Sequence, residues 1–276
     1  PNDEPLPTLA GRSTKAEVDA RTAAQQALPK ITPPIDAALP QQATGVRPSR
    51  ALPYELHTSA RSDSAGGRVQ LLFANSGKSA AVFHVYDKLH LADRLPRRFM
   101  VEPGKQLNDY WNAMADDAGL YDLWVLGPNG YHRQFKGNLN TLRAGGAAAP
   151  EIRVGYDVKR GELLLQLRNE GARECRFTVQ SNKAYALPHL LGPAGHSNAQ
   201  DGNNAGQGHG RDGSWSVRVS GGEEATMRWR LESSGQWYDF AVNCDADAAF
   251  YRRLAGRVET GRHAVSDPAM GMADQF

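Results

Sequence analysis

The sequence has few cysteines, no long apolar run and no excess of either charge. Only Cys175 and Cys244 occur among its 276 residues, and no stretch approaches the roughly 20 apolar residues that a transmembrane helix needs. The 32 lysines and arginines are balanced by 30 aspartates and glutamates. Because the basic residues are also scattered instead of forming one patch, nucleic acid is not an expected partner.

Common catalytic signatures are also missing. The chain has no GxSxG nucleophile elbow, no P-loop and no GxGxxG motif after a predicted strand. Two adjacent acidic pairs, Asp116–Asp117 and Glu223–Glu224, are interpreted as turn and solvent charges, because neighbours on a strand point to opposite faces. The residues alone therefore predict a non-catalytic chain with no metal site and no cofactor.

What the sequence does contain is an internal repeat. The segment at 68–85 returns without a gap at 162–179, an offset of 94. The segment at 121–137 returns at 238–256 with offsets of 117 and then 119, so the second copy carries about 23 additional residues (117 minus 94). Repetition of this kind indicates one structural unit used twice.

Each copy consists of short alternating segments separated by turn residues. Seven such segments per copy predict an all-β chain made of two tandem immunoglobulin-like antiparallel β-sandwiches. We place the first sandwich at 51–142 and the second at 150–262, with an insertion at 184–213 and a tail at 263–276. A helical or α/β fold in either half would contradict this prediction.

Residues 1–50 differ in kind from the repeats. Eight prolines break this segment into extended pieces, interrupted by one predicted helix at 14–28, where Thr14 and Glu17 have capping-box spacing. The remainder is typical of a proline-rich linker. Since a linker joins two folded parts, we expect another domain before it.

Aromatic residues recur at matching positions of the two copies. Trp111 and Trp229 coincide, and we expect both to lie in the core. Tyr121 and Tyr238 begin the penultimate strand of each copy, where a sandwich often has a tyrosine whose hydroxyl ties down a corner.

Cys175 and Cys244 each share an alternating face with apolar neighbours, so both thiols should point inward. Two interpretations stay open. If their strands lie in opposite sheets, the two residues could form a disulfide across the core. Otherwise they are buried, unpaired and act as small hydrophobic residues.

The insertion at 184–213 holds three histidines, His189, His196 and His209, but their spacing is not that of a zinc site, and a flexible surface loop is favoured. Its first part contains Leu187, Leu190 and Leu191 between prolines. Apolar residues on a loop either pack back on their own domain or meet a partner or membrane. Packing back on the second repeat is the favoured interpretation here; if they do not pack back, these leucines are the candidates for lipid or partner contact.

Four segments carry a resemblance to a known family. They are RPSRALPYELHTSA (47–60), LLFANSGKSAAVFHVYD (71–87), YDLWVLGPNGYHRQFKG (121–137) and YDFAVNCDADAAFYRRLAG (238–256). Together they resemble the tandem C-terminal domains of bacterial phosphocholine-preferring phospholipases C, over about residues 45–262. The resemblance implies an enzyme secreted through the twin-arginine route, whose N-terminal phosphoesterase domain cleaves phosphatidylcholine or sphingomyelin to phosphocholine.

None of the motifs of that catalytic domain occurs in this sequence, so no catalytic residue is carried over and the chain is expected to be inactive alone. Two functions compete. In the first, the chain is an accessory region that supports the N-terminal phosphoesterase domain or contacts a choline-phospholipid surface. In the second, it is a free-standing module that binds protein or carbohydrate. The resemblance favours the first and implies a secreted or periplasmic bacterial protein.

Overall fold

The computed structural model describes residues 14–30, 32, 43–142, 146–185, 190–191 and 213–272. It divides into two units, Pro1–Gln41 and Gln42–Phe276. The first contains helix α1 (Lys15–Gln26), which begins with the predicted capping box: the Thr14 side chain accepts from the Glu17 amide, and the Glu17 carboxylate accepts from the Thr14 amide. No helix in the described ranges is long and apolar enough to cross a membrane.

The second unit is mostly β, with antiparallel pairing throughout its described strands. The first repeat comprises β2 (Leu56–Asp63), β3 (Arg68–Asn75), β4 (Ala81–Asp87), β5 (Arg97–Val101), β6 (Lys105–Trp111), α2 (Ala113–Asp117), β7 (Leu120–Leu126), β8 (His132–Asn138) and α3 (Leu139–Leu142). The second comprises β9 (Pro150–Asp157), β10 (Glu162–Asn169), β11 (Cys175–Ser181), β12 (Leu190–Leu191), β13 (Ser214–Val219), β14 (Glu224–Arg230), the 3-10 turn η1 (Glu232–Ser234), β15 (Trp237–Cys244) and β16 (Asp247–Arg257). Two short strands, β1 (Pro48–Ser49) and β17 (Ala264–Val265), pair with each other.

Each repeat has its own apolar core between two sheets. Period-2 alternation builds it: on β3, Val69, Leu71 and Phe73 are fully buried while the intervening residues are more exposed. Trp111 and Trp229 are both buried and belong to the two cores, as their recurrence predicted.

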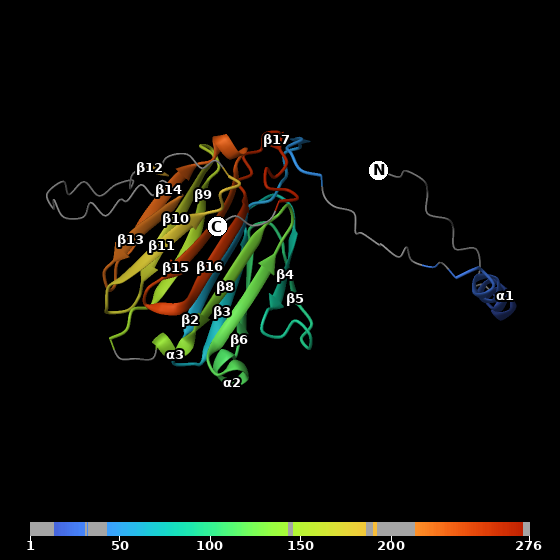
Figure 1. Cartoon of the computed structure of the whole chain (residues 1–276), viewed down its shortest axis with the longest axis horizontal. Helices are drawn as coiled ribbons and strands as arrows, with labels where there is room; N and C mark the ends of the chain where they lie inside the picture. The colour runs from blue at the N-terminus through green and yellow to red at the C-terminus, as the bar shows by residue number, and fades with distance from the viewer. Residues whose placement is uncertain are drawn as a thin grey trace. The chain divides into compact units, whose positions relative to one another are not determined.

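The two repeats are not separate sandwiches, because one sheet runs through both. Its eight strands have the order β13-β11-β15-β16-β8-β7-β4-β5, and β16 pairs antiparallel with β8 across the junction (Figure 1). The repeat pattern did not predict this shared sheet. Alternation in a sequence determines which face of a strand is buried but carries no information about which strand pairs at its edge. The immunoglobulin-like character of each half stays a prediction.

The shared Asn-x-Gly motif has the same structural role in both repeats. Asn75 donates from its side-chain amide to two backbone carbonyls and accepts from the amide of Gly77, and Asn169 repeats this arrangement with Gly171. A Cβ atom on Gly77 would lie 2.5 Å from a backbone oxygen, and one on Gly171 would lie 2.2 Å from another. Only glycine fits, which explains why both copies keep the motif.

Candidate functional site

Two buried arginines at matching positions of the repeats cross the junction. Arg133 on β8 donates to the Tyr238 hydroxyl at 2.7 Å, and Arg252 on β16, its counterpart at the offset of 119 (252 minus 133), donates to the Tyr121 hydroxyl at 2.9 Å. Each also donates to a backbone carbonyl of the opposite repeat, at 2.7 and 2.6 Å. Neither arginine is accessible to solvent. The junction is therefore pseudo-two-fold symmetric and holds the repeats as one body.

The tyrosine-corner prediction was wrong. Tyr121 and Tyr238 bond through their hydroxyls to the arginine of the other repeat, not to the backbone of their own corner. Gly137 makes room for the Tyr121 ring, since a Cβ there would lie 2.5 Å from the hydroxyl oxygen. The matching tyrosines thus recur because the junction needs them.

The two halves of the junction differ in charge. Arg252 forms a bidentate ion pair with Glu151, with both N–O distances 2.9 Å. The first-repeat residue that matches Glu151, at the offset of 94, is His57. Burial lowers the pKa of His57, and the charge of Arg133 lowers it further, although Glu55 opposes both. Arg133 instead packs against the faces of aromatic rings, and its guanidinium lies 4.2 Å from the centre of the Tyr131 ring.

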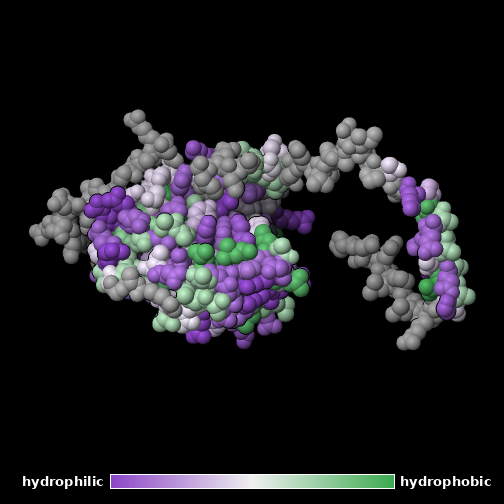
Figure 2. All heavy atoms as spheres, turned by 60° about the horizontal axis from the view of Figure 1, so that its bottom comes forward, coloured by the Kyte–Doolittle hydropathy of each residue, from purple (hydrophilic) through white to green (hydrophobic). Residues whose placement is uncertain are grey.

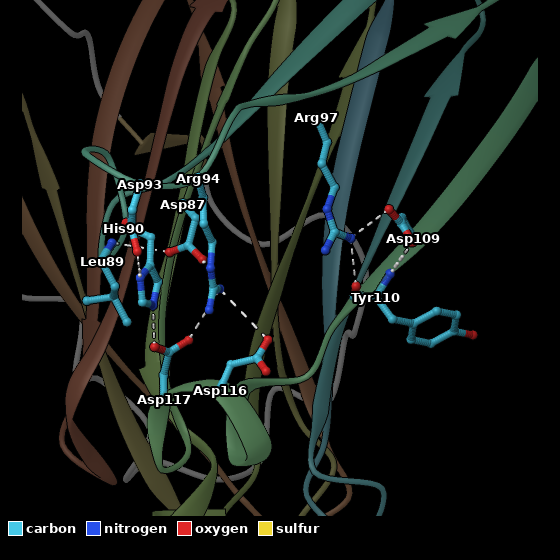
Figure 3. A network of polar contacts seen from close by, with 10 residues as sticks. All are labelled: Asp87, Leu89, His90, Asp93, Arg94, Arg97, Asp109, Tyr110, Asp116 and Asp117. Atoms are coloured by element: carbon cyan, nitrogen blue, oxygen red, sulfur yellow. Dashed lines mark hydrogen bonds and ion pairs between the residues drawn. The ribbon is translucent and has the colours of Figure 1, made fainter.

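A second polar network fixes the loop between β4 and β5 against α2 (Figure 3). Arg94 donates to Asp87 at 2.9 Å, and the Nε2 atom of His90 lies 2.5 Å from a carboxylate oxygen of Asp117. Arg94 also lies 3.8 Å from both Asp116 and Asp117. These contacts link the loop at 88–96 to the end of β4 and to α2.

The bond to Asp117 raises the pKa of His90, against the opposing effect of desolvation. His90 is therefore positively charged over a wider pH range than an isolated histidine. Asp116 and Asp117 belong to helix α2. Asp116 is exposed, as expected of a solvent charge. That interpretation was wrong for Asp117, which is largely buried and lies beside His90.

Asp87, His90 and Asp117 are close enough to be considered as metal ligands, since one atom of each lies within 4.8 Å of the others. The surroundings do not fit a metal ion. The guanidinium of Arg94 already contacts both carboxylates, and a metal would need His90 neutral, whereas Asp117 favours its protonated form. The cluster is an ion-pair network that holds the loop in shape.

The same loop exposes three leucines, Leu89, Leu91 and Leu95, which we call the apolar tip. Their exposed fractions are 44 %, 57 % and 93 %. Leu89 points away from the polar network in Figure 3. Figure 2, which brings the lower end of the molecule in Figure 1 forward, shows apolar and strongly polar surface side by side there. The loop therefore exposes its leucines together with Lys88 and Asp93, while His90 contacts α2.

A serine and a histidine also meet in the first repeat, which sequence reasoning missed. The Ser76 hydroxyl lies 2.8 Å from Nε2 of His57 and 2.7 Å from a carboxylate oxygen of Glu55. This is not a catalytic triad, because the carboxylate contacts the serine directly instead of orienting the far nitrogen of the histidine. The amides of Ser76, Gly77 and Lys78 all donate within the protein, so none is free to stabilise an oxyanion.

Comparison with known proteins identifies the family to which these repeats belong. A family model described as the C-terminal domain of bacterial phospholipase C matches residues 48–138 and again residues 150–257. The chain belongs to this family. The two matched segments coincide with the two repeats, and each contains one of the junction arginines.

Three phospholipases C are similar to the chain over most of its length. A non-hemolytic phospholipase C of Pseudomonas aeruginosa is 41 % identical over 99 % of the chain. A non-hemolytic phospholipase C of Burkholderia pseudomallei is 35 % identical over 87 %, and a hemolytic phospholipase C of Pseudomonas aeruginosa is 34 % identical over 85 %. The chain spans only 35 %, 30 % and 31 % of these relatives.

In this phospholipase C C-terminal region the two cysteines lie close together, but not as an inter-sheet pair. Cys175 on β11 and Cys244 on β15 belong to neighbouring strands of one sheet, because Phe177 is the residue opposite Cys244. Both are buried, as predicted, and both are free thiols in contact with each other. The hydrogen bond with Cys244, together with burial, raises the pKa of Cys175.

The candidate contact residues of the insertion are described only in part. Leu187, His189, His196 and His209 lie outside the described residues. Leu190–Leu191 form strand β12, whose backbone pairs with β14 opposite Trp229 and Arg228. Their strand thus extends the second repeat's smaller sheet, and whether they contact lipid or a partner stays a prediction.

Proposed function

We propose that this chain is the non-catalytic C-terminal region of a secreted bacterial phospholipase C that hydrolyses phosphatidylcholine or sphingomyelin to phosphocholine. In this proposal an N-terminal phosphoesterase domain of the same polypeptide performs the hydrolysis. The C-terminal region supports that domain, shapes access to its active site or contacts the lipid surface.

One observation carries the proposal: both repeats match the C-terminal domain of bacterial phospholipase C, in relatives about three times as long as the chain. The geometry favours a supporting role, because the junction arginines bond each repeat to the other and join them in one body. Such a body can hold a neighbouring domain or a lipid surface at a fixed orientation. The serine and histidine that meet lack both the triad arrangement and free oxyanion donors.

Leucines 187, 190 and 191 are proposed as one contact of this region with the catalytic domain or the lipid. Strand β12 supports this in one respect, since its pairing with β14 keeps residues 190–191 at a defined edge of the sheet.

The test compares two proteins against phosphatidylcholine and a soluble phosphodiester: this chain, and the full-length polypeptide that contains it, each with and without added divalent metal. We expect turnover only from the longer protein. Ser76→Ala in the longer protein should leave turnover unchanged. Hydrolysis that copurifies with the short chain and disappears with Ser76→Ala or His57→Gln would overturn the proposal.

A further inference from the structure

We propose that the apolar tip, Leu89, Leu91 and Leu95, inserts into the surface of a zwitterionic phospholipid bilayer. The inference deepens the proposed function and rests on it, because it names one partner of the region and the residues that meet it. The tip belongs to the first repeat and is distinct from the leucines of the insertion, which belong to the second repeat.

The first argument is exposure. Leu95 has 93 % of its surface exposed, and Leu91 has 57 %. Single exposed leucines are common on protein surfaces, but this loop places three within seven residues. Figure 1 shows the connection between β4 and β5 projecting beyond the end of β5. A projecting loop of this kind can enter a soft surface without any rearrangement of the sheets behind it.

The second argument is that the tip cannot fold back to hide its leucines. Arg94 and His90 alternate with them along the loop and are held by Asp87 and Asp117. The Arg94 amide also donates to the His90 carbonyl at 2.9 Å, which closes a turn. Since the loop is ordered before contact, insertion carries little additional cost in conformational entropy.

The third argument is charge. The loop at 88–96, its two flanking strands and α2 carry four lysines or arginines. Four aspartates of the same segments balance them: Asp87, Asp93, Asp116 and Asp117. A neutral surround gives no attraction to an anionic membrane and no repulsion from a zwitterionic one. Apolar burial is then the driving force.

A protein partner fits the tip less well. A stable protein interface covers about 800 Å² on each side, whereas the tip is one short loop surrounded by ion pairs. Hydrocarbon can surround a narrow tip on all sides, so a bilayer can bury all three leucines at once.

The experiment measures cosedimentation of the 276-residue chain with large unilamellar phosphatidylcholine vesicles. Burying a leucine is worth about one decade in a partition coefficient. We therefore expect Leu91→Ser with Leu95→Ser to weaken partition by about tenfold or more. Leu107→Ser is the matched control, since Leu107 is 42 % exposed on β6, and it should bind like the unmodified chain. About 0.5 M salt should change little, because apolar burial is not screened.

Several results would overturn the proposal: no binding of the unmodified chain to phosphatidylcholine vesicles, equal binding of the double variant, or binding that needs anionic lipid and is lost in salt. A double variant that binds vesicles normally but slows hydrolysis by the full-length enzyme would show that the tip contacts the catalytic domain instead. If the double variant fails to fold, Leu95→Ser alone serves, since that side chain contacts almost nothing. Partition does not depend on hydrolysis, so it is judged separately from the proposed function.

Discussion

Replacing Arg252 with methionine tests whether the junction holds the repeats together through a buried ion pair. The substitution keeps most of the apolar stem and removes the guanidinium. It leaves the Glu151 carboxylate, whose side chain is 14 % exposed, without its bidentate partner. It also removes the donor to Tyr121 and to the Lys136 carbonyl.

Breaking a buried pair by removing one partner costs about 3–5 kcal/mol. We expect the lower end of that range here, because water reaches part of the Glu151 carboxylate. Arg133→Met is the matched control at the pseudo-symmetric position. It leaves no carboxylate unpaired, and the hydroxyls of Tyr156 and Tyr238, 3.0 Å apart, still bond to each other. Its cost should be about 1–2 kcal/mol.

The assay is urea unfolding at neutral pH, followed by tryptophan fluorescence and circular dichroism. The unmodified chain should unfold its two repeats in one transition. Adding Glu151→Gln to Arg252→Met removes the uncompensated charge and should recover at least about 1 kcal/mol. The reasoning is refuted if Arg133→Met costs as much as Arg252→Met, or if Glu151→Gln recovers nothing in the Arg252→Met background.

Three further predictions concern titration, thiols and the insertion. Ring-proton NMR should give His90 a pKa above 6.5 and His57 one below it. His90 then stabilises the fold below about pH 6.5 and loses this effect as pH rises through its folded pKa. His57 acts oppositely: its contribution is complete above about pH 6.5 and is lost as pH falls. His90→Gln and His57→Gln should each abolish one of these slopes, and unchanged slopes would contradict the assignment. Cys175 and Cys244 should react with a thiol reagent only after unfolding; a native mass lower by two hydrogens would show a disulfide instead. Leu190→Asp with Leu191→Asp should leave the melting temperature of the chain nearly unchanged. If these leucines contact lipid, the variant weakens binding of the intact enzyme to choline-lipid vesicles; if they contact the catalytic domain, it lowers turnover of a soluble phosphodiester instead. Loss of the second repeat's fold would mean that these leucines are core.

The strands could be predicted from the sequence because burial alternates along them. On β3 and β10, side chains point alternately to the core and to solvent, and the leucines and phenylalanines follow that period. The turns could be predicted because Gly77 and Gly171 occupy positions that only glycine fits. Both features depend on residues that are close together in the sequence, so a short stretch of sequence is enough to predict them.

The junction could not be predicted in the same way, because edge pairing between β8 and β16 is made by backbone groups. One signal was nonetheless present. Arg133 and Arg252 stand at inward-facing positions, next in alternation to Tyr131 and Phe250. A charge on an apolar face, kept by both copies, indicates a buried partner. The exposure of the apolar tip could not be predicted, because leucines between two strands have the same sequence pattern whether they pack on the sheet or face solvent.

The strand registers bear on how two apolar segments could serve one enzyme. The tip follows β4, whose end lies near Leu123 and Phe135, toward the Asn138 end of β8. The insertion follows β11, whose end lies near Phe240 and Leu254. Because β8 and β16 are antiparallel, these two connections leave the eight-stranded sheet at opposite ends.

A flat bilayer that contacts one end of a rigid sheet cannot contact the other end at the same time. If the tip enters lipid, the connection that follows β11 leaves the sheet at the other end, and we propose that residues 190–191 serve a neighbouring domain. Serine substitutions at the tip and aspartate substitutions at 190–191 should then affect different measurements, vesicle partition for the first and turnover of a soluble phosphodiester by the intact enzyme for the second. Loss of vesicle partition by both sets of variants would be incompatible with one rigid junction.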